Sequence, residues 1–341
     1  MPDRVFLVTG ASGFIGRALC RTLQPMGRVR ALLHRPVSGP WHEALTVDLA
    51  QAAPPIEVLE GVDAVFHLAG KAHAVDEGRE DDGGHHALTV DGTRRLLEAC
   101  RRARVPRLVF VSSVKAMGEG GERVLDESAI ANPRSAYGRS KRAAEVLVLD
   151  GGYVAHASVL RLPLVYGPGQ KGNLMRMIEA VDRGQFPSLP RVHNRRAMIH
   201  ADDVARAALL AADNPAASGR VFIVSDGREY STREIYQWIC AELRVQPPAW
   251  TMPLFAFRIL AATGEVVRRV SGRRWRFDAD AYHKLFGSAV YDTSAARDAR
   301  AGRRFQTPRD GPQTRNRAGG ALDSSLPSGP GGHTLARLRP Y

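Results

Sequence analysis

Cysteine is scarce in this chain of 341 residues, which has only three, Cys20, Cys100 and Cys240. They lie far apart and match no metal-binding spacing, and no cluster of histidines and acids suggests a metal site either. A small secreted domain would carry more cysteines, so we expect reduced thiols and a cytoplasmic protein. The start of the sequence also lacks the charged and then apolar layout of a signal peptide.

Long apolar runs are missing as well, since none reaches the roughly 20 residues that a membrane-spanning helix needs. The nearest run, residues 252–270, is interrupted by a proline, an arginine, a glycine and a glutamate. Arginines follow it closely, so a basic amphipathic helix lying on a membrane is one interpretation. We favour the other, which is a helix that packs on a second lobe and has a solvated basic end.

Acidic residues are outnumbered, with 35 Asp and Glu against 48 Lys and Arg, and the net charge is +13. Such a charge raises nucleic acid as a partner. However, residues 297–341 have nine arginines, no lysine and three aspartates, and so hold six of the thirteen excess charges. The rest is spread over a large body without a nucleic-acid module motif. We predict no nucleic-acid binding, and a modest basic surface also suits an anionic substrate.

Short apolar runs alternate with amphipathic segments in the first half of the chain. We expect strands at 5–8, 29–33, 44–47, 64–68, 108–111 and 159–162, helices at 15–23, 92–103 and 140–149, and a loop at 76–86. This alternation predicts an α/β fold, a Rossmann-like doubly wound parallel sheet with helices on both faces.

The pattern changes after Gly167, where helices and turns dominate and one more strand is expected at 221–224. We therefore predict a dinucleotide-binding domain at 1–166, with later crossings near 195–226. A smaller, mostly helical substrate-binding lobe is expected at 167–308, and the composition of 309–341 predicts a disordered basic tail.

A glycine-rich turn follows the first expected strand. The segment from Thr9 reads Thr-Gly-Ala-Ser-Gly-Phe-Ile-Gly and opens a helix. Gly10, Gly13 and Gly16 allow a tight turn and a close approach of the backbone to a pyrophosphate at the helix N-terminus. The spacing is G-x-x-G-x-x-G instead of the common G-x-G-x-x-G, and it predicts a dinucleotide cofactor.

The end of the second expected strand bears on which dinucleotide binds. NAD specificity usually requires an acid there to bond the ribose 2′-hydroxyl, and this chain has Leu-His-Arg-Pro ending at Pro36. Arg35 can accommodate a 2′-phosphate, which favours NADP(H) over NAD.

Tyr137 and Lys141 are four residues apart in a segment with a helical pattern, so they share one helix face. A nearby ammonium favours the phenolate, and we expect it to lower the pKa of Tyr137 and make it an acid and base near neutral pH. The spacing alone occurs often by chance.

Together these segments resemble the extended short-chain dehydrogenase/reductase family, the NAD-dependent epimerase/dehydratase group that acts on nucleotide sugars. The resemblance runs from residue 4 to about 308. The motifs that carry it, besides the glycine turn, are Val47-Asp48-Leu49, His67-Leu68-Ala69-Gly70, Phe110-Val111-Ser112-Ser113, Tyr137-Gly138-Arg139-Ser140-Lys141 and Arg161-Leu-Pro-Leu-Val-Tyr-Gly-Pro168.

The resemblance implies a role for each matching residue. The catalytic residues would be Ser113, Tyr137 and Lys141, because the family's S-x-x-x-Y-G register selects Ser113 over Ser112. Cofactor contacts would come from Gly10, Ser12, Gly13, Phe14, Ile15, Gly16, Arg35, Asp48 (on the adenine), Leu49, Leu68, Ala69 and Gly70, and from Tyr137 and Lys141. Asn173 and Arg196 match the residues that bind the diphosphate region of UDP-sugars.

Departures from the family pattern narrow the expected chemistry. The 4,6-dehydratases of the family carry Asp-Glu directly after their catalytic Ser or Thr, and this chain has Val114-Lys115. We therefore disfavour a dehydratase. Met117 stands where a Tyr is frequent, and Thr89 where many relatives have Asn, and we assign Thr89 no catalytic role.

The resemblance implies an oxidoreductase that acts at C4 of a nucleotide sugar. Arg35 and the residues after Ser113 favour a UDP-4-keto-hexose reductase of surface polysaccharide biosynthesis, and a UDP-glucose or UDP-N-acetylglucosamine 4-epimerase is the alternative. A third hypothesis is a non-catalytic scaffold protein that binds a dinucleotide. The family also implies a homodimer that pairs the helices near 92–103 and 138–149.

Overall fold

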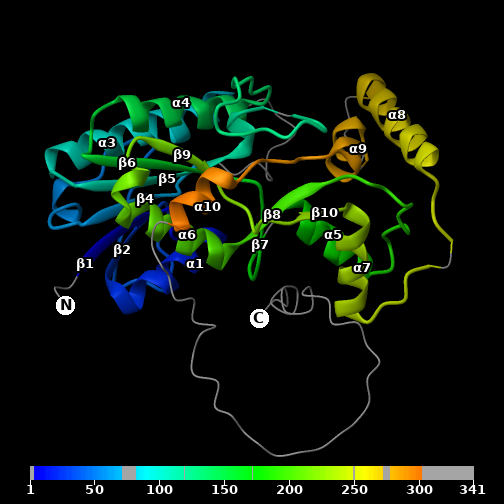
Figure 1. The fold of residues 1–341 in the computed structure, drawn as a ribbon, viewed down its shortest axis with the longest axis horizontal. Coiled ribbons are helices and arrows are strands. Elements are labelled where there is room, and N and C mark those ends of the chain that lie inside the picture. The colour runs from blue at the N-terminus through cyan, green and yellow to red at the C-terminus, as the bar shows by residue number, and fades with distance from the viewer. Residues whose placement is uncertain are drawn as a thin grey trace, which may run out of the picture.

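The computed structural model describes residues 4–70, 82–118, 120–170, 172–248, 250–271 and 277–301 of the chain. Its centre is a parallel sheet of seven strands in the order β3-β2-β1-β4-β5-β6-β9 (Figure 1). The strands are β1 (Arg4–Thr9), β2 (Gly27–Leu33), β3 (Glu43–Thr46), β4 (Ala64–His67), β5 (Arg107–Ser113), β6 (His156–Leu162) and β9 (Arg220–Ile223). The order reverses at β1, and in doubly wound folds ligands bind beyond the C-terminal strand ends at such a reversal.

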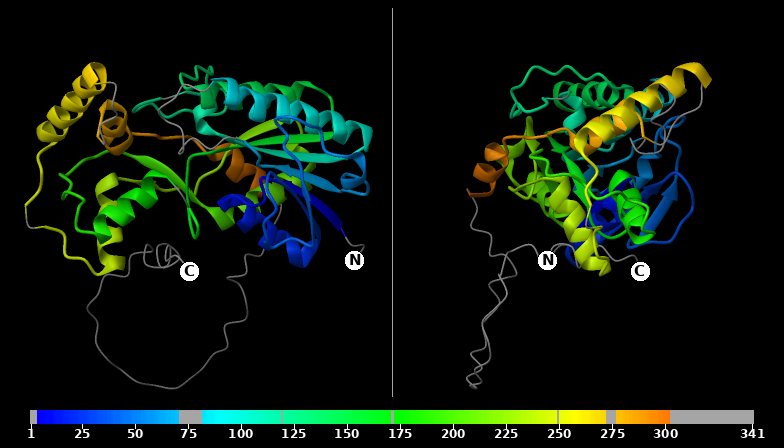
Figure 2. Two further views of the ribbon diagram at one scale, coloured as in Figure 1. Left: turned by 180° about the vertical axis from the view of Figure 1, so that it is seen from behind. Right: turned by 90° about the vertical axis from the view of Figure 1, so that its right-hand side faces the viewer.

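Helices cover both faces of this sheet (Figures 1 and 2). One face carries α1 (Phe14–Leu23), α6 (Ala201–Asp213) and α10 (Ser294–Ala301), and the other carries α3 (Gly92–Arg102) and α4 (Ala136–Asp150). Side chains alternate along β1, so Phe6 and Val8 enter the core with α1 and α6, and Leu7 enters the core with α3 and α4. This arrangement confirms the predicted doubly wound α/β fold.

A second, three-stranded sheet has the order β10-β8-β7. Its strands are β7 (Leu164–Tyr166), β8 (Arg196–His200) and β10 (Glu229–Tyr230), with β7 parallel and β10 antiparallel to β8. The expectation of a single further strand after Gly167 is therefore wrong. These strands have two to five residues, too few for an alternating pattern to show, and they exist through pairing with one another.

Four helices accompany the small sheet, namely α5 (Asn173–Asp182), α7 (Thr232–Leu243), α8 (Leu254–Ser271) and α9 (Ala279–Phe286). A third apolar core joins Leu174 and Met177 of α5 to Met198 of β8, Tyr236 of α7 and Phe257 of α8. This cluster shares no residue with the cores of the large sheet. The proposed boundary between residues 166 and 167 remains a prediction.

The expected elements of the first half all form, with ends shifted by up to four residues. The expected loop at 76–86 is wrong in part, because α2 (Asp82–His85) and a π-helical turn (His86–Asp91) lead into α3, while 71–81 lie outside the described residues. The predicted tail at 309–341 also lies outside them. Within the described ranges, no helix combines the length and the apolar character that a membrane crossing would need.

Candidate active site

The glycine turn joins β1 to α1 at the C-terminal edge of the sheet. Gly10 has φ +67°, and a Cβ there would lie 2.8 Å from the backbone nitrogen of Ala69. A Cβ on Gly16 would overlap the carbonyl oxygen of Gly10. These two positions therefore exclude a side chain, because the turn and the start of α1 pack directly on each other.

The N-terminus of α1 fits a bound pyrophosphate. Its N-cap, Gly13, contributes no side-chain hydrogen bond, and the first turn contains no acid. Ser12 and Gly13 are exposed, while Phe14 and Ile15 are half-buried. The amide groups and the positive end of the helix dipole are thus left for an anion, as in dinucleotide-binding turns.

A buried polar chain fixes the ends of β1 and β4 beside this turn. Thr9 Oγ1 accepts the backbone amides of Leu68 and Ala69 at 3.2 and 3.1 Å, so its own proton points to His67 Nδ1 at 2.6 Å. His67 Nε2 then donates to Thr93 Oγ1 at 2.9 Å, and that hydroxyl donates to a carbonyl one turn earlier. Burial, and to a smaller degree the charge of Lys141, lower the pKa of His67 to about 3. His67 therefore stays neutral and acts as a structural link.

The expected adenine end lies between β3 and α3. Leu49 is buried, and its carbonyl oxygen is 3.2 Å from the place that a Cβ on Gly92 would take. Half-buried Asp48 accepts the amide of Ala50 at 3.0 Å. Arg35 is the second residue after the end of β2 and is exposed. In dinucleotide-binding folds, residues near this strand end bear on cofactor specificity.

Ser113, Tyr137 and Lys141 come together at the C-terminal end of β5. Ser113 is the last residue of the strand, and its side chain hydrogen-bonds the Tyr137 side chain. Lys141 is buried one turn further along α4, where Nζ donates to the carbonyl of Val111 at 2.9 Å and lies 4.6 Å from the ring centroid of Phe110. The same Nζ is 3.3 Å from the place of a Cβ on Gly70. The trio therefore borders the predicted cofactor strand end.

The electrostatics of the trio differ from the expectation in one respect. Burial raises the pKa of Tyr137 above its usual value, and the Ser113 hydrogen bond offsets part of this rise. The predicted lowering of the Tyr137 pKa is wrong, because desolvation of the phenolate is the largest influence on it. Burial also lowers the pKa of Lys141 to about 8, although the charge of Glu145 opposes the shift.

Glu145 and Arg161 form a buried ion pair directly behind the trio. Arg161 donates from Nε and NH2 to the two carboxylate oxygens of Glu145 at 3.0 and 2.7 Å. Ser112 Oγ donates to the same carboxylate at 2.6 Å, and Arg142 adds a contact at 3.2 Å. Glu145 lies one turn beyond Lys141 on α4, so the network joins α4 to β5 and β6 and holds a negative charge near the ammonium.

Sequence reasoning missed this pair, although two signals pointed to it. A charged residue, Arg161, interrupts the otherwise apolar end of a buried strand, and Glu145 repeats the four-residue spacing that relates Tyr137 to Lys141. A buried arginine requires a partner, and the helix that carries Lys141 offers one.

The segment after Ser113 is a short 3-10 helix (Val114–Ala116) in which Val114 and Ala116 are buried. Its polar side chain is Lys115, so no acid follows the serine. A Cβ on Gly138 would run into the carbonyl of Lys115, which explains the close contact of this turn with α4. Met117 is buried.

The two predicted substrate residues lie in the part of the fold built on the small sheet. Asn173 is exposed at the start of α5, and Arg196 is half-buried at the start of β8, where NH2 donates to the carbonyl of His283 at 3.3 Å. The neighbouring Arg195 forms an ion pair with Glu229.

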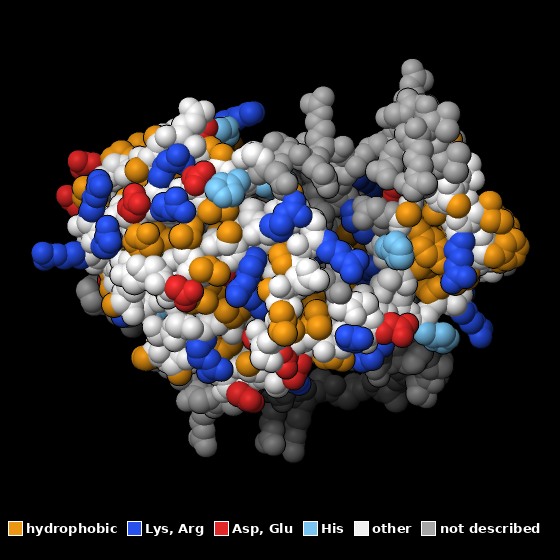
Figure 3. Space-filling view, turned by 90° about the horizontal axis from the view of Figure 1, so that it is seen from above, with side chains coloured by type: hydrophobic (Ala, Val, Ile, Leu, Met, Phe, Trp, Pro, Cys, Tyr) orange, Lys and Arg blue, Asp and Glu red, His pale blue; other side chains and the backbone are white. Residues whose placement is uncertain are grey.

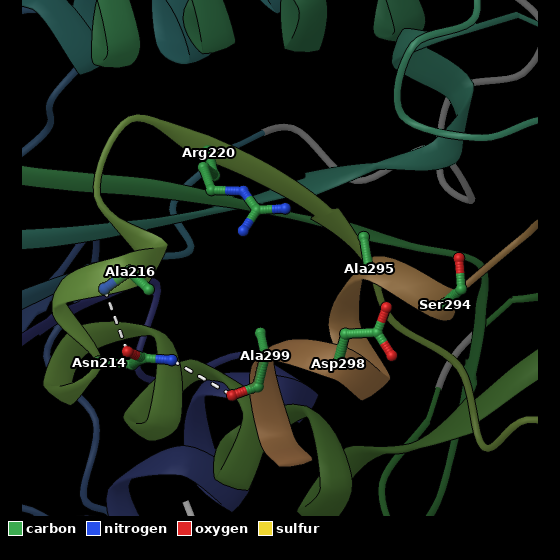
Figure 4. A pocket seen from close by; sticks show the side chains of 7 residues that line it. All are labelled: Asn214, Ala216, Arg220, Ser294, Ala295, Asp298 and Ala299. Atoms are coloured by element: carbon green, nitrogen blue, oxygen red, sulfur yellow. Dashed lines mark hydrogen bonds between the residues drawn. The ribbon is translucent and has the colours of Figure 1, made fainter. Parts of the chain in front are cut away.

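A pocket of about 570 Å³ lies beside β9, the strand at one edge of the large sheet (Figure 4). Its lining residues are Asn214, Ala216, Arg220, Ser294, Ala295, Asp298 and Ala299. Arg220 is the first residue of β9, so the pocket lies at the N-terminal end of that strand, away from Ser113 at the C-terminal end of β5. Its position does not match that of a dinucleotide or its substrate.

Known proteins are similar to this chain in sequence and in architecture. Residues 6–225 match the model of the NAD dependent epimerase/dehydratase family. A UDP-glucose 4-epimerase of Vibrio cholerae is 28% identical over 287 residues, covering 80% of this chain and 86% of the relative. A 2-alkyl-3-oxoalkanoate reductase of Stenotrophomonas maltophilia is 30% identical over 250 residues, covering 69% and 74%.

Among solved structures, MoeE5 in complex with UDP-glucose and NAD aligns with a TM-score of 0.63 at 30% identity, covering 71% of this chain and 83% of MoeE5. The family match spans well over half of the chain, and it includes the glycine turn and the Ser113, Tyr137 and Lys141 segment. The chain therefore belongs to the NAD dependent epimerase/dehydratase family, and it is an enzyme of this extended short-chain dehydrogenase/reductase type.

Proposed function

We propose that the protein is an NAD(P)-dependent oxidoreductase acting at C4 of a nucleotide sugar, and specifically a UDP-4-keto-hexose reductase of surface polysaccharide biosynthesis. One observation carries the proposal. The Ser113–Tyr137 hydrogen bond and the Lys141 ammonium meet at the strand end that also borders Gly70 and the α1 turn. This arrangement supports proton transfer to a carbonyl oxygen beside a nicotinamide.

Each member of the trio has a separate task in the proposed reaction. Tyr137 gives its proton to the C4 oxygen as the carbonyl is reduced, and Ser113 bonds the same oxygen and holds it toward the phenol. Lys141 stabilises the phenolate that forms. The nicotinamide, when bound, supplies the hydride to C4. Raising the pKa of Tyr137 by burial keeps the phenol protonated before the transfer, which suits a proton donor.

We propose that the cofactor is held by the α1 turn through Gly10, Ser12, Gly13, Phe14, Ile15 and Gly16, by Asp48 and Leu49 at the adenine, and by Leu68, Ala69 and Gly70 directly after β4. Arg35, exposed at the end of β2 with no acid beside it in sequence, supports NADP(H) over NAD. Asn173 and Arg196 would contact the diphosphate of the sugar nucleotide. The division into domains at 1–166 and 167–308 belongs to the same proposal.

A 4-epimerase is the second candidate, and a specific observation favours it. The Vibrio cholerae relative is a UDP-glucose 4-epimerase, and MoeE5 was solved with UDP-glucose and NAD. An epimerase would use the same trio in both directions and would keep its cofactor. Arg35 favours the reductase because NADP(H) serves as a consumed reductant.

Purified protein separates the two candidates. The reductase predicts stoichiometric oxidation of NADPH by a UDP-4-keto-hexose and no release of tightly bound NAD from the denatured protein. UDP-glucose and UDP-galactose interconversion without added cofactor would instead establish the epimerase.

The variant Tyr137→Phe tests whether the trio is catalytic at all. It should lower kcat/KM by about 100-fold or more while cofactor affinity stays unchanged, because only the transferred proton is lost. Activity equal to that of the wild type would instead support the non-catalytic dinucleotide-binding scaffold.

A further inference from the structure

Arg17 stands out among the many positive side chains of this protein. On the face shown in Figure 3, Lys and Arg side chains are dispersed, and Asp and Glu side chains lie among them. Arg17 is instead half-buried in the first turn of α1, directly after Gly16 of the glycine turn, and it contacts two loops. The proposed reaction does not use it, so its contacts call for a separate explanation.

The guanidinium of Arg17 joins the glycine turn to the loop between β2 and β3. Its Nε donates to the carbonyl of Ser12 at 3.3 Å, and Nη2 donates to the carbonyl of Ser38 at 3.0 Å. Its Cζ lies 5.6 Å from the ring centroid of Trp41, which is within the range of a cation–π contact. One side chain thus connects the turn proposed for the pyrophosphate with the loop proposed for cofactor selectivity.

Trp41 fixes the far end of that loop. Its ring is half-buried and packs on the core that α1 also enters. A Cβ on Gly39 would overlap this ring, and the Trp41 amide donates to the Gly39 carbonyl at 2.9 Å, so the chain folds tightly back on the ring. The next residue, His42, exchanges two hydrogen bonds with Val29 of β2. The loop therefore ends at a fixed point on the sheet.

Residues 34–39 lie between β2 and this fixed point, and all of them are exposed. They include Arg35, on which the proposed preference for NADP(H) depends. A segment with so little burial opens easily unless other contacts hold it. Leu33 ends β2 before Arg35, and Ser38, which Arg17 holds, comes three residues after it. The backbone of Arg35 is thus restrained on both sides.

We propose that Arg17 is a positioning residue for the cofactor: together with Trp41 it holds residues 34–41 against the glycine turn and so keeps Arg35 where the 2′-phosphate of NADP(H) binds. This inference rests on the proposed function, because it assumes the NADP(H) site at these loops. A loop that is ordered before binding loses less conformational entropy when the cofactor arrives. NAD has no 2′-phosphate, so it should depend less on the position of Arg35.

Isothermal titration with NADPH and with NADH tests the proposal, together with hydrogen exchange of the cofactor-free protein. Arg17→Met keeps the aliphatic stem and removes the donors and the charge. We expect it to weaken NADPH binding at least about tenfold and NADH binding by no more than about threefold. The peptide that covers 34–41 should exchange faster than in the wild type. Circular dichroism and the melting temperature verify that the variant folds.

Two further variants separate the geometry of this contact from its charge. Trp41→Leu removes the ring, and its effect on NADPH affinity should not add to that of Arg17→Met, because both changes release the same loop. Arg17→Lys keeps the charge but lacks the planar fork that donates to two carbonyls, so it should bind NADPH about as weakly as Arg17→Met. Additive effects, or wild-type NADPH affinity in Arg17→Lys, would overturn the proposal.

The matched control is Arg21→Met, which removes the same charge at an exposed position one turn further along α1. It should leave both affinities and the exchange of 34–41 unchanged. Equal weakening of NADPH binding in Arg21→Met and Arg17→Met, or an equal loss for NADPH and NADH in Arg17→Met, would overturn the proposal. A wild type that prefers NADH would contradict the proposed NADP(H) cofactor, whereas unchanged exchange of 34–41 in Arg17→Met would contradict only the role of Arg17, so the two failures are distinguishable.

Discussion

Glu145 holds a buried negative charge one helical turn beyond Lys141, and it bears on the protonation of that lysine. Burial lowers the pKa of Lys141 to about 8, and the charge of Glu145 limits the fall. If the ammonium is the active form, activity declines as pH rises through about 8. Glu145→Gln removes the charge but keeps an acceptor for Ser112. We expect the alkaline limb of the kcat/KM profile to move to lower pH.

The variant also leaves Arg161 without its counter-charge, so the free energy of unfolding should fall by about 3 kcal/mol. The profile must therefore be measured below the melting temperature of the variant. Arg142→Gln is the matched control, because it removes a half-buried contact of the same carboxylate while Arg161 and Ser112 keep theirs, and it should leave the limb in place. If the alkaline limb of the kcat/KM profile does not move in Glu145→Gln, the charge of Glu145 does not affect the protonation of Lys141.

The Lys141 shift has a consequence for stability as well. The pKa of its ammonium falls from the ordinary 10.5 to about 8 on folding, so between these values the unfolded chain binds the proton more tightly than the folded one. Stability then rises with pH across this window. Lys141→Met should flatten that part of the curve, which urea unfolding at a series of pH values measures.

Substitution of Arg35 tests the proposed preference for NADPH over NADH. Arg35→Asp removes the cation and offers an acceptor for a ribose 2′-hydroxyl, so the ratio of kcat/KM for NADPH to that for NADH should fall by about tenfold or more. Arg21→Asp, an equally exposed change at the far end of α1, should leave the ratio unaltered. A wild-type enzyme that prefers NADH would contradict the NADP(H) proposal directly.

At the residue scale, closeness in space could be predicted where a short motif fixes both identity and spacing. Ser113, Tyr137 and Lys141 are close in space because a strand end and one helix face bring them there, and sequence spacing encodes both. The direction in which the Tyr137 pKa shifts could not be predicted from the motif. It depends on how much water the surrounding fold excludes, which no local pattern specifies.

At the scale of elements, the turn between β1 and α1 is the part of the proposed cofactor site that tolerates side chains least. A methyl group on Gly16 has no room against the Gly10 carbonyl, so Gly16→Ala must push α1 away from the turn. We expect a loss of about 2 kcal/mol in stability and at least about tenfold weaker cofactor binding. Isothermal titration and thermal unfolding measure the two effects.

Thr22→Ala provides a control on the same helix, because the Thr22 hydroxyl only bonds back to the Ala18 carbonyl. It should leave cofactor affinity unchanged. Unaltered affinity in Gly16→Ala would mean that the cofactor does not approach this turn.

Elements were predictable in proportion to their length and burial. The strands β1, β4, β5 and β6 stand out because they are mostly buried and read as apolar runs, whereas the edge strand β3 has no buried residue. The strands of the small sheet were missed because β8 and β10 gain their stability from each other and from α5 and α7. The interrupted apolar run at 252–270 indicated the helix that forms α8, but its exposed apolar side becomes visible only when its packing partners are known.

At the scale of the whole molecule, the outer surface of α3 and α4 is the proposed dimer interface. Both helices lie on the same side of the large sheet, and Leu96, Leu97, Ala144 and Val148 point from them into one core. Val146 is a large apolar side chain on α4 that remains 41% exposed. A two-fold interface uses the same patch on both subunits, so Val146 would contribute to it twice.

Val146→Glu therefore places two like charges in the proposed interface and should convert a dimer into a monomer in sedimentation velocity. Met26→Glu is the matched control, since Met26 is 42% exposed and lies in the short 3-10 turn Gln24–Met26 after α1. It adds the same charge beside α1, on the other face of the large sheet, and should remain dimeric. A dimer that survives Val146→Glu would exclude the α3–α4 face and direct the search to other surfaces.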